Sequence, residues 1–269
     1  MALHLTFPPT FPRITYLVTL IFLLLAGIVL YVCVAAMIAS GIHTRYRRRS
    51  DHPTVSVVIP ARNEEQTISD LLESLLVVDY PSERLEVVLV NDQSTDRTRK
   101  IAESFRGRFL CRYEIFDVEP EQNSTLRAKT RPLAQGIDRA HGEFVLMPDA
   151  DNRVPGNWVK CMVSYFSDDV GMVCGTTLPD PHRQSRQVLT ALETVDAALL
   201  LGTCAGFSGL GKTQALIGSN FAVRRSAYQQ IGTYRSLDYH EIEDLSLLHA
   251  LQATDSGRLF FRRIGTRSC

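Results

Sequence analysis

Short apolar segments alternate with amphipathic segments from residue 54 onward, and this alternation restricts the fold more than any other feature. Residues 55–60 are apolar, rich in valine and end in a proline, which is typical of a buried strand. Residues 64–78 then carry leucine and isoleucine at helical spacing, and residues 86–90 form a second apolar segment. This order predicts an α/β fold, with helices flanking a mixed, mostly parallel sheet.

The same alternation continues through the rest of the chain. A helix that Ser94, Thr95 or Asp96 can cap is expected to run to about residue 105. Further strands are expected at residues 144–147, 170–174 and 217–223.

An apolar helix is expected from residue 188 to about residue 201, with Glu193 and Asp196 on one side. Such a helix belongs either to the core of the domain or to the surface of a membrane. We favour the core.

Residues 14–42 contain no charged side chain. A helix needs about 20 apolar residues to cross the hydrocarbon of a bilayer, and this segment is longer. A cleaved signal peptide is the competing interpretation, but its apolar region would be only about 7–15 residues long. We therefore expect an uncleaved transmembrane helix, preceded by a short lead (1–13) and followed by a basic linker (43–53).

The arginines beside this segment predict its orientation. Four arginines lie between residues 45 and 49, whereas Arg13 alone precedes the apolar segment. Because the more basic flank of a membrane helix stays in the cytoplasm, the N-terminus is expected outside. Residues 54–269 would then form one cytoplasmic domain of a single-pass cell-membrane protein.

The overall charge bears on the class of partner. The chain has 269 residues and a formal net charge of zero, which gives no reason to expect a nucleic-acid partner. None of the cysteines belongs to a Cys-x-x-Cys pair, so no zinc site is predicted.

Two carboxylates, Asp149 and Asp151, follow the strand predicted at residues 144–147. Alternate side chains of an extended segment share a face, so these carboxylates are expected to project together. Such oxygen ligands suit Mg²⁺ or Mn²⁺ that a diphosphate also holds, which indicates a nucleotide-activated substrate. The alternative is a solvated Asp-Ala-Asp turn.

Polar residues also follow the first two predicted strands, at residues 61–64 and 91–96. In open α/β sheets, ligands bind beyond the carboxyl ends of the strands. We therefore expect the three polar clusters to line one binding site.

Taken in order, these motifs resemble those of membrane-anchored, inverting glycosyltransferases of family 2, which have the GT-A fold. The resemblance covers about residues 54–251. It depends on Val-Ser-Val-Val-Ile-Pro-Ala-Arg-Asn-Glu-Glu (55–65), Val-Asn-Asp-Gln-Ser-Thr-Asp-Arg-Thr (90–98), Ala-Lys-Thr-Arg-Pro-Leu-Ala-Gln-Gly (128–136), the Asp149/Asp151 segment, Gly-Ser-Asn-Phe-Ala-Val-Arg-Arg (218–225) and Glu243-Asp244.

The resemblance implies which residues bind the nucleotide. The uracil and ribose of a UDP-sugar would be held by Pro60, Ala61, Arg62, Glu64 and Asp92. Lys129 corresponds to the family's basic residue near the nucleotide.

The resemblance also implies the metal and catalytic residues. Asp149 would contact the ribose or the sugar, and Asp151 would bind, together with Asp149, the Mg²⁺ or Mn²⁺ that bridges both phosphates. Asp244 would be the general base that takes the proton of the acceptor hydroxyl.

Each of these assignments has a structural alternative. Asp92 and Asp96 would serve as helix caps, and Lys129 would belong to a solvated basic turn. Glu243 and Asp244 would simply favour a helix N-terminus electrostatically.

The expected function is sugar transfer from a nucleotide-sugar to a lipid-linked or glycan acceptor at the cytoplasmic face of the membrane. Family members with several membrane helices continue with a Gln-x-x-Arg-Trp segment, which is missing here. An inactive or truncated nucleotide-sugar-binding module is therefore the alternative. Residues 206–213 also satisfy the P-loop pattern of NTPases, but they follow a predicted helix, so we expect a glycine-rich loop.

Overall fold

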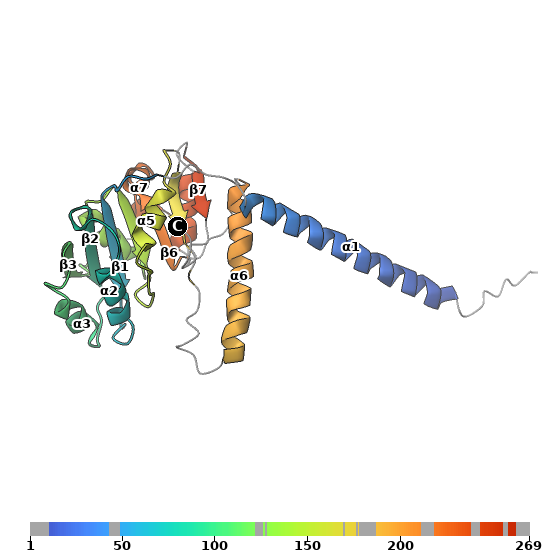
Figure 1. The fold of residues 1–269 in the computed structure, drawn as a ribbon, viewed down its shortest axis with the longest axis horizontal. Helices are drawn as coiled ribbons and strands as arrows, with labels where there is room; N and C mark the ends of the chain where they lie inside the picture. The colour runs from blue at the N-terminus through green and yellow to red at the C-terminus, as the bar shows by residue number, and fades with distance from the viewer. Residues whose placement is uncertain are drawn as a thin grey trace, which may run out of the picture.

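The computed structural model describes residues 11–42, 49–121, 126, 128–168, 170–175, 177, 187–210, 218–237, 243–254 and 258–261. Within these residues, seven strands form one sheet in the order β3-β2-β1-β4-β6-β5-β7 (Figure 1). The strands are β1 (Val55–Ala61), β2 (Leu85–Asn91), β3 (Arg112–Asp117), β4 (Phe144–Pro148), β5 (Val170–Cys174), β6 (Asn220–Arg224) and β7 (Arg258–Phe261).

The sheet is mixed and mostly parallel, as the sequence predicts. Strands β3, β2, β1 and β4 run parallel to one another. Strand β6 runs antiparallel to both β4 and β5, and β7 pairs in parallel with β5. The carboxyl ends of β1, β2 and β4 therefore meet at one edge of the sheet, where ligands bind in this architecture.

Helices cover both faces of the sheet, with the exception of α1, which points away from it. They are α1 (Phe11–Ile42), α2 (Ile68–Leu76), α3 (Thr98–Ser104), α4 (Thr130–Arg139), α5 (Trp158–Ser164), α6 (Gln187–Gly209), α7 (Arg225–Gln230) and α8 (Glu243–Gln252), with 3-10 turns η1 (Ser82–Arg84) and η2 (Tyr234–Ser236). Helix α2 begins four residues later than expected from the apolar spacing, because the backbone N–H groups of Glu64 and Glu65 bind side chains beyond β2.

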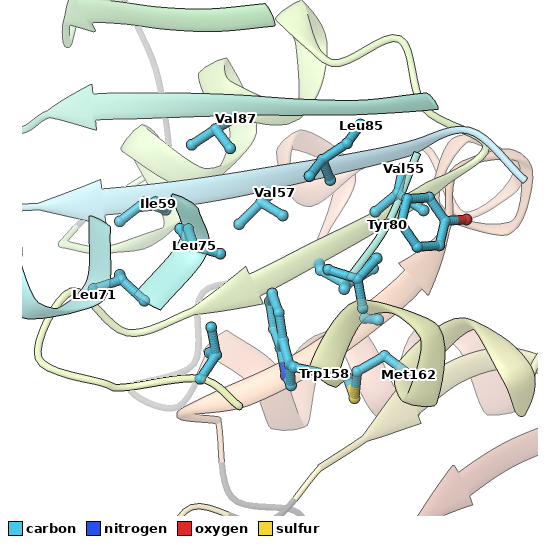
Figure 2. Close-up of a cluster of buried hydrophobic side chains, with 14 of the residues drawn as sticks. Val55, Val57, Ile59, Leu71, Leu75, Tyr80, Leu85, Val87, Trp158 and Met162 are labelled. Carbon is cyan, nitrogen blue, oxygen red and sulfur yellow. The ribbon is translucent and has the colours of Figure 1, made fainter. Parts of the chain in front are cut away.

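Alternate residues of β1 face two separate cores, because successive side chains of a strand point to opposite faces. Val57 and Ile59 belong to the core covered by α2, α3 and α5, which Figure 2 shows around Trp158. Val58 belongs to the core covered by α4, α6, α7 and α8. Both faces of the central strands are thus buried, which is why these strands read as continuous apolar segments.

Helix α4 lies very close to the sheet at Gly136. A Cβ atom at this position would lie 2.4 Å from Cγ1 of Val58 and 2.9 Å from Cγ2 of Val90. A larger side chain would therefore push α4 away from β1 and β2, and with it the residues at the start of α4.

Helix α6 departs from its expected place in the core. Leu201, Cys204 and Ala205 are buried, but Val195 and Leu199 are 58% and 67% exposed. The helix also continues to Gly209, eight residues beyond its expected end. The expectation of a core helix is therefore wrong for much of the described part of α6.

Helix α1 confirms the helix expected over residues 14–42. Its segment Thr15–Met37 has a mean hydropathy of 3.0 and no buried residue, so its length and composition suffice to cross a membrane. Figure 1 shows α1 leaving the domain beside α6 and pointing away from it, and the two helices pack against each other.

Candidate functional site

The loops after β1 and β2 are fastened to each other at the carboxyl edge of the sheet. Asn63 donates its backbone N–H to Oγ of Ser94 (3.1 Å), and its Oδ1 accepts the N–H of Thr95 (2.8 Å). Asn63 and Gln93 have φ angles of +56° and +54°, a region that asparagine tolerates better than most residues. The two polar clusters therefore form one connected wall.

Asp96 and Thr98 complete this connection. Oγ1 of Thr98 accepts the N–H of Glu64 (2.7 Å), and Oδ2 of Asp96 accepts the N–H of Glu65 (3.1 Å). Oδ1 of Asp96 accepts the N–H of Thr98, the first residue of α3 (2.9 Å), so Asp96 satisfies one N–H at the start of this helix, while Arg97 is the N-cap residue. Burial opposes the charged form of Asp96, but the hydrogen bonds from Thr98 and Glu65 hold its pKa below the usual value.

The carboxylate of Glu64 forms a hydrogen bond within its own loop. Its Oε2 accepts a hydrogen bond from the hydroxyl of Thr67 (2.6 Å), which lies just before α2. Pro60 and Ala61 are the last two residues of β1 and are buried. These three residues therefore shape the floor and rim of the site.

Asp92 and Arg62 form an ion pair at the rim. Nη1 of Arg62 lies 3.8 Å from Oδ2 of Asp92, and their side chains are 63% and 16% exposed. The N–H of Asp92 donates to the carbonyl of Ala61 (2.8 Å), which holds the half-buried carboxylate beside the end of β1. A guanidinium this exposed can turn toward an incoming phosphate at little cost.

Lys129 and Asp149 meet directly, although 20 residues separate them. Nζ of Lys129, at the start of α4, donates to Oδ1 of Asp149, immediately after β4, and both side chains are half-buried. Lys129 therefore lies against Asp149 at the edge of the sheet, in the turn that precedes α4. An ammonium this close to the sheet edge adds positive charge where a diphosphate would bind.

The expectation that an extended chain projects Asp149 and Asp151 together is wrong. Strand β4 ends at Pro148, and the N–H of Asn152 donates to the carbonyl of Asp149 (3.1 Å), which closes a turn. Proline ends the ladder because it has no N–H to donate. Asp149 points to Lys129, while Asp151 is exposed and, among the described residues, has no hydrogen-bonding or ionic partner.

The carboxylates at this turn are compatible with a divalent cation. The described residues contain no cluster of three or more His, Cys, Asp or Glu side chains that could hold a metal. Mg²⁺ and related ions bound to nucleotides take one or two carboxylates from the protein and further ligands from phosphates. Asp151, exposed on this turn, provides one such carboxylate, while the carboxylate of Asp149 is engaged by Lys129.

Strand β6 braces the turn from the other side. The N–H of Asp149 donates to the carbonyl of Ser219 (3.1 Å), and Nδ2 of Asn152 donates to the same oxygen (2.5 Å). The antiparallel pairing of Pro148 with Asn220 places these groups side by side. Ser219 and Asn152 were missed from the sequence, although Ser219 lies in the Gly-Ser-Asn motif that supports the family resemblance.

Gly218, which precedes Ser219, lies directly against the side chain of Asp244. A Cβ atom on Gly218 would lie 2.0 Å from Oδ2 of Asp244, so the carboxylate occupies the space that a side chain would take. Asp244 is 6% exposed, and its Oδ1 accepts the N–H of Leu245 (2.9 Å) in the first turn of α8. Asp149 and Asp244 therefore flank the same two residues, Gly218 and Ser219.

Asp244 also lies close enough to Cys174 to act on its thiol electrostatically. Burial, followed by the negative charge of Asp244, raises the pKa of Cys174 at the end of β5 well above its usual value. Cys174 is fully buried, so its thiol stays neutral. The position of Asp244 in the first turn of α8 also fits its structural alternative, because the helix N-terminus favours a carboxylate there.

The remaining motif residues are structural. Oδ1 of Asn220 accepts the Nε1–H of Trp158 (3.1 Å), and Trp158 is 1% exposed in the core. The P-loop pattern begins inside α6, which ends at Gly209, and its residues 211–213 lie outside the described part of the chain. A P-loop follows a strand, so the pattern has the wrong context, and the loop expected at residues 206–209 is helix instead.

Fold and site together define the class of this protein. Acidic and basic side chains gather beyond the carboxyl ends of parallel strands, an arrangement typical of α/β domains that bind nucleotides. Residues 56–232 match Glycosyl transferase family 2, which is more than half of the chain. The chain therefore belongs to glycosyl transferase family 2.

A curated relative shows how much of a longer protein this chain matches. The chain is 28% identical over 198 residues to the probable glycosyltransferase YdaM of Bacillus subtilis (strain 168). The matched region is 72% of this chain and 46% of YdaM, so the chain spans about half the length of that relative.

Solved structures establish the fold. The mannosyltransferase PcManGT from Pyrobaculum calidifontis, in complex with GDP-Man and Mn²⁺, has a TM-score of 0.62 at 21% identity, covering 84% of this chain and 60% of that one. TarS 1–349 from S. aureus, in complex with UDP-GlcNAc, has a TM-score of 0.53 at 22% identity, covering 80% and 59%. The domain thus has the GT-A fold implied by its motifs.

Proposed function

We propose that this protein is a membrane-anchored, inverting glycosyltransferase that moves a sugar from a nucleotide-sugar, expected to be a UDP-sugar, to a lipid-linked or glycan acceptor. Residues 54–269 would form its catalytic domain on the cytoplasmic face of the membrane, and α1 its anchor. The observation that carries this proposal is the convergence of Lys129, Asp149 and Asp244 around Gly218 and Ser219.

The donor would lie along the carboxyl edge of β1, β2 and β4. The wall formed by the loops after β1 and β2 offers Asp92, with the exposed Arg62 beside it, to the base and ribose. Lys129 lies next to Asp149, where it would offset the charge of the diphosphate. The binding of UDP-GlcNAc by TarS and of GDP-Man by PcManGT supports a nucleotide-sugar donor.

Asp151, together with Asp149, would hold Mg²⁺ or Mn²⁺. When bound, such an ion stabilises the negative charge that develops on the departing diphosphate. The exposed carboxylate of Asp151, which has no partner among the described residues, supports this role, as does the Mn²⁺ in the PcManGT complex.

Asp244 would take the proton from the acceptor hydroxyl. In this step the acceptor oxygen forms a bond to the anomeric carbon while the bond from that carbon to the diphosphate oxygen breaks. The electron pair of the broken bond stays on the diphosphate. One displacement from the opposite face inverts the anomeric centre and needs no protein nucleophile.

The first experiment identifies the donor. Melting temperatures of the purified chain would be measured with UDP, GDP, UDP-GlcNAc, UDP-glucose and GDP-mannose, each with and without Mn²⁺. A ligand at about 100 times its dissociation constant adds about 2.7 kcal/mol of stability, which raises the melting temperature visibly. No shift with any nucleotide would contradict the proposal.

The second experiment tests the carboxylates, with release of labelled sugar from the donor selected above and transfer to a membrane lipid extract as readouts. Asp151→Asn should abolish the Mn²⁺-dependent part of the activity. Asp244→Asn should keep nucleotide binding but lower transfer by about 10²–10⁴-fold. Asp168→Asn, an exposed carboxylate elsewhere, is the matched control.

The outcomes separate the alternatives. Full activity of Asp151→Asn would refute the metal role, and equal loss of binding and transfer in Asp244→Asn would refute the role of general base. UDP binding without sugar release by the unaltered chain would favour a nucleotide-sugar-binding module.

A further inference from the structure

Helix α6 has one buried face and one exposed apolar face. Leu201, Cys204 and Ala205 are at most 8% exposed and pack in the core on the α4 side of the sheet. Val195, Leu199 and Leu200, which we call the outer face of α6, are 58%, 67% and 51% exposed. Three large apolar side chains on one helix leave an apolar surface that a monomeric soluble domain ordinarily covers.

The position of this helix is as informative as its exposure. Helix α6 packs against β7, the last strand of the sheet, and against α1. In Figure 1, α6 runs along the end of the domain from which α1 leaves, while β3 lies at the opposite end. The exposed fraction of α1 falls to 39% at Val34 and 37% at Met37, near the end of α1 that adjoins the domain.

We propose that the outer face of α6 lies in the interfacial region of the lipid bilayer that α1 spans. This inference rests on the proposed anchor and goes beyond it, because it fixes which side of the domain faces the membrane. Contact with α1 makes the apolar surface of α6 continuous with a helix long enough to span the bilayer. If α1 spans a bilayer, this contact places α6 beside the surface of the same bilayer.

The composition of α6 favours a helix that lies in the interface over one that crosses the bilayer. Its apolar segment Thr194–Ser208 is shorter than a spanning helix requires. Asp196 is exposed and, at about 100° per residue, lies between Leu199 and Leu200 around the helix. A carboxylate on this side would be costly in the hydrocarbon core but is tolerated at the boundary of headgroups and acyl chains.

This orientation would bring the candidate base toward the membrane. Leu201, Cys204 and Ala205 on the buried face of α6 share one core with residues of α8, the helix that carries Asp244 in its first turn. In this orientation α6 would lie between the bilayer and the core to which α8 belongs. An acceptor hydroxyl carried on a lipid would reach Asp244 from this side.

Tryptophan reporters can test the depth of each helix. The chain has one tryptophan, Trp158, which is 1% exposed and gives a constant background. The full chain would be reconstituted in phosphatidylcholine vesicles, with and without bromine on the acyl chains, carrying Leu199→Trp, Phe22→Trp or Leu110→Trp. Phe22 lies in α1, and Leu110, which is 94% exposed, lies just before β3 at the far edge of the sheet.

The expected result is that Leu199→Trp and Phe22→Trp lose most of their emission in brominated vesicles, while Leu110→Trp does not. Aqueous acrylamide should quench Leu110→Trp strongly and Leu199→Trp weakly. Binding of UDP at the same concentration by all three variants would show that the fold is intact.

Three results would overturn the inference. If Phe22→Trp is quenched by bromine and Leu199→Trp is quenched by acrylamide, the anchor holds and α6 faces water. If Leu199→Trp is protected from both quenchers and the protection depends on the ratio of protein to lipid, a second copy covers α6. If Phe22→Trp escapes bromine, the proposed anchor fails as well.

Discussion

At the scale of single residues, the site depends on side chains that hold one another in place. Asp149 is held by Lys129 through its carboxylate and by Ser219 through its backbone N–H. The carboxylate of Asp244 accepts the N–H of Leu245 and lies in the space that a side chain at position 218 would fill. Residues that carry no charge therefore decide where the charged groups point.

Gly218→Ala tests this dependence. The new methyl group would overlap Oδ2 of Asp244, so the carboxylate or the backbone has to move, at a cost of about 1–3 kcal/mol in unfolding free energy. We expect sugar transfer to fall far more than nucleotide affinity, as measured by kinetics and by the melting shift with UDP.

Gly202→Ala is the matched control, because a Cβ atom at Gly202 in α6 meets nothing within 4 Å. This substitution should leave transfer unchanged and raise stability by up to about 1 kcal/mol, since alanine favours helices more than glycine does. A Gly218→Ala variant as active as Gly202→Ala would show that Asp244 tolerates displacement.

A second cluster of charge lies at the opposite edge of the sheet and serves stability. Oε1 of Glu86 accepts the hydroxyl of Ser56 (2.5 Å) and the N–H of His141 (2.5 Å), and its Oε2 accepts Nη1 of Arg112 (3.0 Å). Burial of Glu86 opposes its charged form, but these hydrogen bonds hold its pKa below the usual value.

This pKa predicts how stability depends on pH. Because the folded pKa of Glu86 is lower than the unfolded value of about 4.3, its contribution is fully present above that pH and is lost as pH falls through the folded pKa. Glu86→Gln should lower the unfolding free energy at pH 7 by about 1–3 kcal/mol. Urea denaturation should show this difference shrinking with acidification, while Glu73→Gln, exposed on α2, shows none.

At the scale of elements, the loops after β1 and β2 behave as one unit. Thr98, the first residue of α3, is fully buried, and its hydroxyl joins the N–H of Glu64 to the carboxylate of Asp96. This single group therefore sets the distance between the starts of α2 and α3. The shape of the candidate site beside these loops follows from that distance.

Thr98→Val removes the hydroxyl while keeping the shape of the side chain. The partly buried N–H of Glu64 loses its acceptor, which should cost about 1–3 kcal/mol in urea denaturation. Nucleotide affinity should fall with it, because the loops separate. Ser104→Ala, in the last turn of the same helix, removes an exposed hydroxyl and should change stability by less than about 0.5 kcal/mol.

At the scale of the whole molecule, the domain is joined closely to α1. Arg49, the last arginine of the basic linker, donates its N–H to the carbonyl of Ser164 (2.9 Å) and pairs with Asp51 and Glu143. The chain is thus fixed to the domain soon after α1 ends at Ile42. A short connection of this kind restricts how far the domain can turn relative to α1.

We predict that α1 remains attached to the mature protein. Its apolar segment is longer than the core of a signal peptide, so cleavage is not expected. Intact mass spectrometry of the protein from membranes should show residues 1–42 present, and alkaline carbonate should leave the protein in the pellet. A mass that lacks this segment would identify a signal peptide instead.

Much of the fold was predictable from the sequence, because the spacing of apolar residues within a segment distinguishes a strand from a helix. The strand at 55–60, the strand at 86–90 and the helix over residues 14–42 appear within a few residues of their expected bounds. The candidate residues Asp92 and Asp149 were found because polar residues follow apolar strands. Each of these inferences depends on residues that are close in the sequence, and the repeat of apolar residues carries information only over such short separations.

The tertiary structure alone decided how these groups meet. The turn after Pro148, the pair of Lys129 with Asp149 and the contact of Gly218 with Asp244 join segments that are distant in the chain. The exposed outer face of α6 likewise depends on what packs beside it, since the same apolar spacing suits a core or a bilayer. Such contacts are set by strand register and packing, which no local pattern encodes.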